Sequence, residues 1–237
     1  MGSVAIGDES GLLAEKAFTG PLRHSSEIFP SLQEILAQVG ATPDDVTEVY
    51  LSAGPGSFTG LRIAVTIAKT MHLATSVRIV AVDTLDAIAA NATALQDAPE
   101  RIAAILDAKR YLFFVAVYER PSRRSTDSAA KAGPALDAPL ADWVKVVPDS
   151  IMAAEQLLQQ FAGQGQTLGV LGDGLLFHQD RFKADGVRLL DQSSWSPRAS
   201  TIYRLGRPKA QCGQFEDPLR LTPFYLTPPE VTLKVQR

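Results

Sequence analysis

The sequence has a single cysteine, Cys212, and no apolar run long enough to cross a membrane. A lone cysteine cannot form a disulfide within the chain, which excludes a disulfide-stapled secreted scaffold and favours a reducing compartment. A transmembrane helix would need roughly eighteen or more consecutive apolar residues, and no such stretch occurs. We therefore expect a cytoplasmic protein that does not associate with membranes.

The chain also lacks an excess of charge of either sign. Its 237 residues include 23 Lys and Arg against 26 Asp and Glu, a formal net charge of -3. That balance does not drive binding to a phosphate backbone, so contact with RNA is expected only indirectly, shared with another protein. With 46% hydrophobic residues, the chain can bury a core, and its length predicts one compact body or two closely packed lobes.

The residues that usually carry catalysis are sparse and scattered. Ser57 has Pro55 two residues before it, where a nucleophile elbow has glycine. A helical metal clamp needs a second histidine one turn after the first, yet Ile28 stands four residues after His24. None of the histidines has a second metal ligand at a suitable spacing: His24, His72 and His178. We expect no catalytic residue, no metal and no cofactor.

The first part of the chain alternates strands and helices. Strands are predicted at 2–6, 12–18, 48–53 and 77–82, and helices at 26–39 and 58–74. The strand, helix and strand from 48 to 82 favour a parallel pair joined by a right-handed crossover. Pro30 predicts an irregular first turn in the helix at 26–39.

The secondary structure of the second part of the chain is predicted less clearly. Strands are predicted at 102–106, 111–118 and 167–171, a helix at 152–161, and a turn at Gly172-Asp173-Gly174 before a further helix. The residues from Leu219 to Leu226 are expected to form an extended tail packed on the body. This pattern predicts an N-terminal lobe at 1–96 and a C-terminal lobe at 97–237, with a flexible insertion near 119–141.

A glycine-rich segment, Gly54-Pro55-Gly56-Ser57-Phe58-Thr59-Gly60, lies between a predicted strand and a helix N-terminus. Backbone N–H groups at such a turn can hold phosphate. However, Leu61-Arg62 follows where a Walker loop has lysine, and the glycine spacing departs from the dinucleotide fingerprint by one residue. The sequence favours a structural loop made by Gly54, Pro55, Gly56, Ser57, Thr59 and Gly60, with nucleotide binding as the alternative.

The helix after this loop has more apolar surface than one contact requires. Apolar side chains between Leu61 and Ala74 cover roughly 200° of its circumference, about twice what a surface helix needs. This excess indicates either complete burial or a second face reserved for another protein, for which glutamate at Val65 or Ala68 would be a test. Together with the helix at 26–39, it predicts a partner interface formed by Ile28, Leu32, Phe58, Leu61, Arg62, Val65, Ala68, Lys69 and His72.

The residues from Gly54 to Ile63, with Ala68-Lys69 and Val82-Asp83-Thr84-Leu85, resemble the bacterial TsaB (YeaZ, glycoprotease-like, peptidase M22-like) family of tRNA threonylcarbamoyladenosine biosynthesis proteins. The resemblance implies an α/β protein with an actin-like ASKHA fold, in which two lobes have mixed sheets flanked by helices. Members usually begin with an apolar strand ending in Asp-Thr-Ser before the strand at 2–6, so either the start of this sequence is misassigned or the first strand is missing. Supporting motifs are His24-Ser25, Leu106-Asp107-Ala108-Lys109, Gly172-Asp173-Gly174, and Pro223-Phe224-Tyr225-Leu226 with Pro228-Pro229-Glu230.

The same resemblance implies a non-catalytic partner subunit. It would dock on and activate the catalytic subunit TsaD, which transfers a threonylcarbamoyl group to tRNA, together with the ATPase TsaE, while touching tRNA only indirectly. The catalytic relative uses a His-x-x-x-His metal clamp, and His24 with Ile28 stand in the matching place. In isolation, a homodimer is a further expected partner state. The alternative functions are a stand-alone ATP-dependent enzyme of the same fold and, less favoured, a metallopeptidase.

Overall fold

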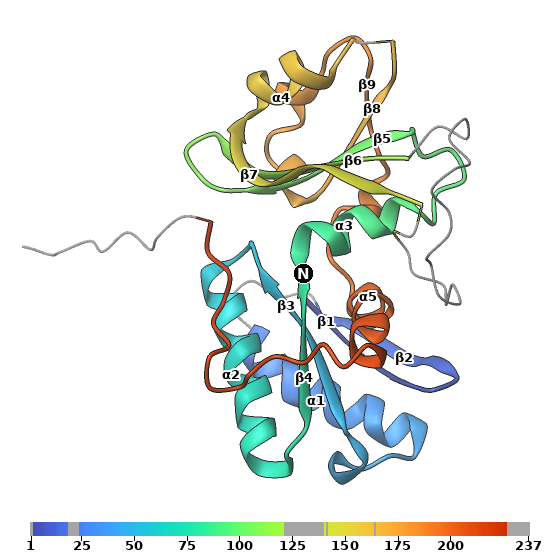
Figure 1. The fold of residues 1–237 in the computed structure, drawn as a ribbon, viewed down its shortest axis with the longest axis vertical. Helices are drawn as coiled ribbons and strands as arrows, with labels where there is room; N and C mark the ends of the chain where they lie inside the picture. Colours follow the sequence, from blue (N-terminus) through green and yellow to red (C-terminus); the bar gives the residue numbers. More distant parts are fainter. Residues whose placement is uncertain (1, 19–23, 121–139, 141, 164, 227–237) are drawn as a thin grey trace, which may run out of the picture.

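The computed structural model describes residues 2–18, 24–120, 140, 142–163 and 165–226. Two lobes are stacked along the long axis of the molecule, and helix α3 (Thr84–Ala92) lies where they meet (Figure 1). Both lobes combine strands and helices, as the strand and helix periodicities predict. None of the helices in the described ranges is both long and apolar enough to cross a membrane.

The first lobe is built from two pairs of strands. β1 (Gly2–Asp8) and β2 (Gly11–Phe18) form an antiparallel hairpin, and β3 (Glu48–Gly54) pairs in parallel with β4 (Arg78–Asp83). α1 (His24–Val39) packs on the hairpin, while α2 (Phe58–Thr75) connects β3 to β4 and packs on β3. The short helix η1 (Pro43–Asp45) follows the N-cap residue Thr42, whose backbone N–H and hydroxyl both donate to the Asp45 carboxylate.

The second lobe contains one mixed sheet with the strand order β7-β6-β5-β8-β9. The central strands β5 (Arg101–Asp107), β6 (Leu112–Glu119) and β8 (Leu168–Leu171) are almost wholly buried, which explains their continuous apolar sequences. β7 (Val144–Ala153) and β9 (Val187–Leu189) form its two edges. Outside the sheet lie α4 (Ala154–Phe161) and the short helices η2 (Asp173–Leu175), η3 (Gln179–Phe182) and η4 (Gln192–Ser194).

Two sequence predictions in this lobe are wrong. The helix predicted at 152–161 begins at Ala154, because Met152 and Ala153 belong to the unpredicted strand β7, which pairs with β6. β7 lacks a clear apolar alternation, so its pairing partner rather than its own sequence determines its conformation. No long helix follows Gly172 in the described chain, only the short η2 and η3. The insertion predicted near 119–141 falls mostly at 121–139 and 141, outside the described residues.

The chain returns to the first lobe near its end. α5 (Ala199–Gln211) packs against β1, β3 and β4, and the residues after it run along the outside of β4 and α2 (Figure 1). Leu221 is buried in that segment, in a cluster with Leu51, Val65 and Ile79. The tail therefore packs on the body as predicted, while the lobe boundary at 96 and 97 stays a prediction.

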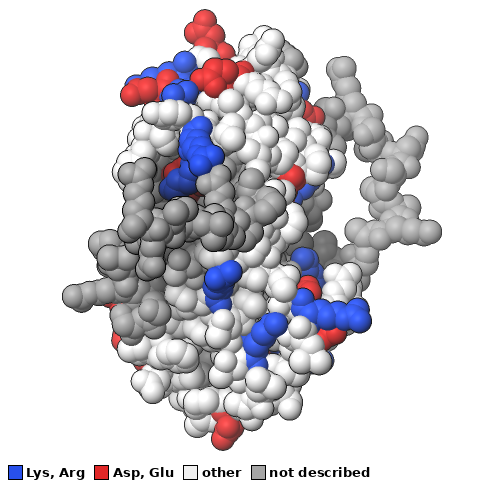
Figure 2. Space-filling model, turned by 90° about the vertical axis from the view of Figure 1, so that its left-hand side faces the viewer, with Lys and Arg blue, Asp and Glu red and all other residues white. Residues whose placement is uncertain are grey.

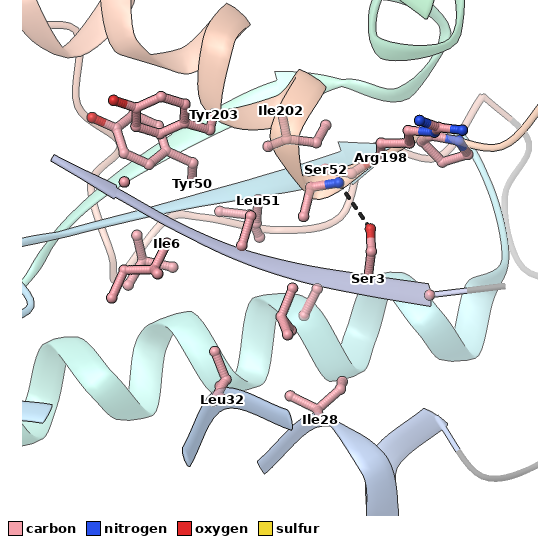
Figure 3. A pocket seen from close by; sticks show the side chains of 18 of the residues that line it. Ser3, Ile6, Ile28, Leu32, Tyr50, Leu51, Ser52, Arg198, Ile202 and Tyr203 are labelled. Atoms are coloured by element: carbon pink, nitrogen blue, oxygen red, sulfur yellow. Dashed lines mark hydrogen bonds between the residues drawn. The ribbon is translucent and has the colours of Figure 1, made fainter. Parts of the chain in front are cut away.

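β1 and β3 lie on either side of a gap in the first-lobe sheet. Ser3 and Ser52 lie at one end of this gap and Ile6 and Tyr50 at the other, so the two strands run in opposite directions (Figure 3). No described strand pairs with the edges that face it, since β1 and β3 belong to separate two-stranded sheets. The α/β fold with two lobes therefore agrees with the expectation from the resemblance.

Candidate partner-docking site

The glycine-rich loop ends β3 and begins α2 in a backbone geometry that demands glycine. Gly54 has φ of 131° and Gly56 has φ of 156°, and the peptide bond between Gly54 and Pro55 is cis. A Cβ atom on Gly54 would lie 2.3 Å from the carbonyl oxygen of Phe224, so any side chain there would displace the C-terminal tail. Gly60 lies within α2, where an added Cβ would meet only ordinary contacts with Ser57. Thr59 is exposed.

An aromatic and cationic cluster covers the start of α2. Ser57 caps the helix, and its hydroxyl oxygen lies 3.4 Å from the Gly60 nitrogen. The guanidinium of Arg62 lies 3.9 Å from the centre of the Phe58 ring, and the Phe58 and Tyr225 rings are 5.2 Å apart. Arg62 Nε also donates to the Tyr225 hydroxyl at 3.4 Å. Loop, helix and tail thus form one exposed surface.

Sequence reasoning did not find the Phe58–Tyr225 contact. The two residues are far apart in the sequence, and neither carries a local signal for the other. Tyr225 stood out only because its neighbours resemble a family motif. A hydrogen bond from the Phe224 N–H to the Ala53 carbonyl fixes the tail at this point.

Three of the predicted interface residues on α2 are buried within the chain. Leu61 and Val65 are nearly inaccessible and Ala68 is 0% exposed. The side chains of Val65 and Ala68 pack with β3 and Leu221 in one core cluster. Their apolar character is therefore accounted for by the first lobe itself, so glutamate at Val65 or Ala68 would disrupt this core rather than test docking.

The remaining predicted residues divide into two groups. Phe58 and Arg62 are exposed. Lys69 and His72 are half-buried, and the His72 Nδ1 lies 2.8 Å from the Val77 carbonyl oxygen, so this side chain fastens the end of α2. Ile28 and Leu32 of α1 are also half-buried and point into a cleft (Figure 3).

This cleft occupies the gap between β1 and β3 and has a volume of about 2160 Å³. Its apolar side is formed by α1 and α2, through residues such as Leu32, Leu36, Ala64 and Ile67. The opposite side is more polar and belongs largely to α5 and β3: Tyr50, Ser52, Arg198 and Tyr203 line it (Figure 3). The second apolar face of α2 therefore borders an unfilled space in the sheet.

The outer surfaces of α1 and α2 also carry large apolar side chains that nothing in the described chain covers. Phe29 is 57% exposed and Leu73 is 80% exposed. Where grey atoms do not cover it, the face of the molecule that contains α2 is mostly uncharged, with separate Lys and Arg side chains near its centre and Asp and Glu toward its edges (Figure 2). Large exposed apolar residues in a weakly charged surface are typical of protein contacts.

A second group of polar residues lies where the cleft reaches the other lobe. Gly172 has φ of 128°, and a Cβ there would lie 1.9 Å from the Ile105 carbonyl oxygen, which brings Asp173 close to the end of β5. Burial raises the pKa of Asp173 to about 6. Asp107 accepts hydrogen bonds from the backbone and the side chain of Lys109, the first of three consecutive residues with left-handed backbone, Lys109, Arg110 and Tyr111.

The turn at 107–111 differs from a phosphate cradle. Consecutive backbone N–H groups in such a cradle need glycines that allow phosphate to approach, and the 107–111 turn contains none. Among the described residues, no three His, Cys, Asp or Glu side chains are grouped so that they could hold a metal ion.

Comparisons with known proteins agree on one family. The family model described as TsaD, tRNA N6-adenosine threonylcarbamoyltransferase, matches residues 20–165. TsaB of Bacillus subtilis (strain 168) is 28% identical over 146 residues, which cover 62% of this chain and 61% of that protein. TsaB of Escherichia coli (strain K12) is 34% identical over 100 residues, which cover 42% of this chain and 43% of that protein.

Solved structures extend the likeness in fold to nearly the whole chain. YeaZ from Pseudomonas aeruginosa superimposes with a TM-score of 0.73 at 22% identity, over 94% of this chain and 93% of that one. A second structure, described as an uncharacterized protein with similarity to peptidase YEAZ from Pseudomonas aeruginosa, superimposes with a TM-score of 0.75 at 22% identity. In sequence, by contrast, the chain spans less than two thirds of the length of the two TsaB relatives. Because the family model matches well over half of its residues, the chain belongs to the TsaD family, within which its relatives are TsaB (YeaZ) proteins.

Proposed function

We propose that this chain is a non-catalytic subunit for tRNA threonylcarbamoyladenosine biosynthesis in the cytoplasm. It docks on a TsaD-like catalytic subunit and activates it together with a TsaE-like ATPase, and it touches tRNA only indirectly. The observation that carries the proposal is the family relationship: the match at 20–165 contains α1, the glycine-rich loop and α2, and the relatives found by sequence are named as tRNA threonylcarbamoyladenosine biosynthesis proteins.

The outer surface of α1 and α2 supports docking through this part of the chain. Phe29 and Leu73 are exposed apolar residues on the two helices, and the Phe58, Arg62 and Tyr225 cluster lies at the start of α2. Aromatic and arginine side chains that already hold one another in place lose little conformational freedom on binding. We therefore assign the contact to the exposed residues Phe29, Phe58, Arg62 and Leu73, with Lys69 at its edge.

The proposed lack of catalysis rests on residue types at the matching positions. The family resemblance places a metal-binding His-x-x-x-His pair on the first helix of the catalytic relative, and Ile28 replaces the second histidine here. Ile28 is half-buried and faces the cleft between β1 and β3. An apolar side chain at that position offers no ligand for a metal ion.

Reconstitution of tRNA modification tests the proposed role. TsaD-like and TsaE-like subunits would be combined with threonylcarbamoyl donor and tRNA, with and without this chain, and the modified nucleoside would be quantified. We expect formation of the modified nucleoside to depend on the chain. Equal activity in its absence would contradict the proposal.

Charge substitutions on the exposed face test where docking occurs. Leu73→Glu and Phe29→Glu are expected to weaken co-purification with the TsaD-like subunit at least tenfold while leaving the melting temperature unchanged. Phe177→Glu is the matched control, because Phe177 is 85% exposed but lies in the second lobe. Equal binding by all three variants would place the contact elsewhere.

The alternative functions make different predictions for the isolated chain. A stand-alone ATP-dependent enzyme would bind ATP with Mg²⁺ at micromolar concentration in calorimetry, and a metallopeptidase would retain a bound metal ion in elemental analysis. A homodimer in isolation would be detected by sedimentation. If it uses the proposed docking face, Leu73→Glu would dissociate it.

A further inference from the structure

A charged cluster lies where the two lobes meet. The ammonium group of Lys145 in β7 is 2.5 Å from Asp149 Oδ1, 2.8 Å from Asp86 Oδ1 and 3.9 Å from Asp83 Oδ2. The hydroxyl of Tyr118 in β6 donates to Asp86 at 2.6 Å, and Lys145 also lies over the Tyr118 ring. Three carboxyl groups from β4, α3 and β7 therefore surround a single cation.

Asp83 has a structural role on one side of this cluster. It is the last residue of β4 and the N-cap of α3, and its Oδ1 accepts hydrogen bonds from the N–H groups of Leu85 at 2.7 Å and Asp86 at 3.0 Å. Both bonds use the same oxygen, which leaves Oδ2 directed toward Lys145 and Asp149. Asp83 thus connects the first-lobe sheet to the helix between the lobes.

One carboxylate oxygen of Asp149, Oδ2, is buried without a hydrogen-bond donor among the described residues. The side chain of Asp149 is only 9% exposed. The carboxyl group of Asp83 lies next to that of Asp149. Two ionised carboxylates have only acceptor oxygens, so a hydrogen bond between them requires one proton. A proton on Asp83 Oδ2 would satisfy Asp149 without disturbing the α3 cap.

We propose that Asp83 and Asp149 share one proton at the junction of the lobes, and that its release loosens the ion-paired contact between α3 and β7 and changes the relative position of the lobes. The proton passes from Asp83 Oδ2 to water, no other bond changes, and the cluster gains one negative charge. Asp83 and Asp149 then repel each other, with Lys145 as the sole cation among the three carboxylates of the cluster.

The junction is suited to transmit this change. Leu85 and Ile88 of α3 belong to the core of the second lobe, whereas Asp83 ends a strand of the first lobe. Burial and the nearby carboxyl groups of Asp149 and Asp86 raise the pKa of Asp83 to about 8. The ionised neighbours also raise the pKa of Lys145, which therefore stays charged while Asp83 titrates. The groups that face Asp83 are Asp86 on α3, Lys145 and Asp149 on β7, and Tyr118 on β6.

Carbon-13 NMR of aspartate-labelled protein tests the shared proton. The carboxyl carbon of Asp83 or Asp149 is expected to titrate between pH 6 and 9, and that transition should vanish in both Asp83→Asn and Asp149→Asn. An amide at position 83 can still accept the α3 cap bonds and donate to Asp149, so the fold is preserved. Titration of both carboxyl groups below pH 5 would overturn the proposal.

Energy transfer between the lobes tests the conformational consequence. Dyes can be attached at the exposed Cys212, beyond the end of α5, and at an introduced cysteine, Gln179→Cys, in the second lobe. We expect transfer efficiency to change between pH 7 and 9 in the wild-type background and to stay constant with Asp83→Asn. A constant efficiency in both backgrounds would overturn the coupling to lobe position.

Discussion

The backbone N–H of Phe224 donates to the carbonyl oxygen of Ala53 at 2.7 Å, joining the C-terminal tail to the end of β3. Directly beside this bond, Gly54 adopts a left-handed backbone, and the Phe224 carbonyl lies where a side chain of residue 54 would begin. The tail therefore depends on a glycine in the loop, and the Phe58 and Tyr225 rings extend the same contact to α2. The glycine-rich loop therefore joins β3, α2 and the tail.

Replacing Gly54 should separate loop from tail. Gly54→Ala places a Cβ atom 2.3 Å from a backbone oxygen at φ of 131°, so we expect a loss of about 3 kcal/mol or more in unfolding free energy. Gly56→Ala is the control, because φ is also positive there but nothing lies within 4 Å of the added atom. Urea denaturation of both variants measures the difference, and equal losses would show that the close approach of the tail contributes nothing.

Core and surface positions of α2 should respond differently to charge. Val65→Glu buries a carboxylate among Leu51, Ala68 and Ile79, for which we expect a loss of about 3 to 5 kcal/mol in unfolding free energy. Leu73→Glu changes an exposed side chain near the end of α2 and should alter stability by less than about 0.5 kcal/mol. Thermal unfolding compares the variants. A stable Val65→Glu protein would mean that the first-lobe core is assembled differently.

Local patterns in the sequence predicted much of the first lobe. The alternation at 2–18, the helical period at 26–39 and the parallel unit at 48–82 each describe an element whose own residues specify it. The apolar arc of α2 was also recognised, but it combined residues that pack on β3, such as Val65, with residues that border the cleft, such as Ile67. A single sequence shows that one face of a helix is apolar, but it does not show which part of the structure covers that face.

Contacts between distant segments were not predictable in the same way. β7 is ordered by its pairing with β6, and Tyr225 meets Phe58 only because the chain returns to the first lobe through α5. The charged cluster likewise joins Asp83 to Asp149 across a segment with weak periodicity. Each of these contacts can be identified only from the tertiary structure, because the sequence around one residue does not indicate which distant residue it contacts.

Filling the gap between β1 and β3 should stabilise the first lobe. An extended segment of about six residues with alternating apolar and polar side chains, joined to Gly2 through a tight Asn-Gly turn, would run antiparallel to β1 and parallel to β3. Its apolar side chains would cover Leu32 and Ile67. Burying about 100 Å² of apolar surface contributes roughly 2.5 kcal/mol. We expect a melting temperature about 5 °C higher or more.

The control for this extension is a segment of equal length made of glycine and serine. It has the same connection and cannot cover the apolar side of the cleft. Slower hydrogen exchange at the amides of β1 and β3 should accompany the alternating segment alone. Equal melting temperatures for the two extended proteins would contradict strand pairing in the gap.

The shared proton also predicts how stability depends on pH. The pKa of Asp83 is raised from 3.8 to about 8 in the folded chain. Below pH 4 the carboxyl is protonated in both states, so its protonation does not oppose folding. Between pH 4 and 8 the unfolded chain releases the proton while the folded chain retains it. Stability is therefore lost with rising pH, by about 1.4 kcal/mol per pH unit for one proton, and the loss is complete above pH 8.

Asp83→Asn removes this dependence because an amide does not titrate. At pH 7 the variant should be more stable than the wild type by about 2 to 4 kcal/mol, and the difference should shrink toward pH 4. Asp180→Asn serves as the control, since Asp180 is exposed and pairs only with Lys183 among the residues with assigned contacts. Urea denaturation at several pH values measures the difference. A variant that is less stable than the wild type at pH 7 would contradict the predicted cost of keeping Asp83 protonated in the folded chain.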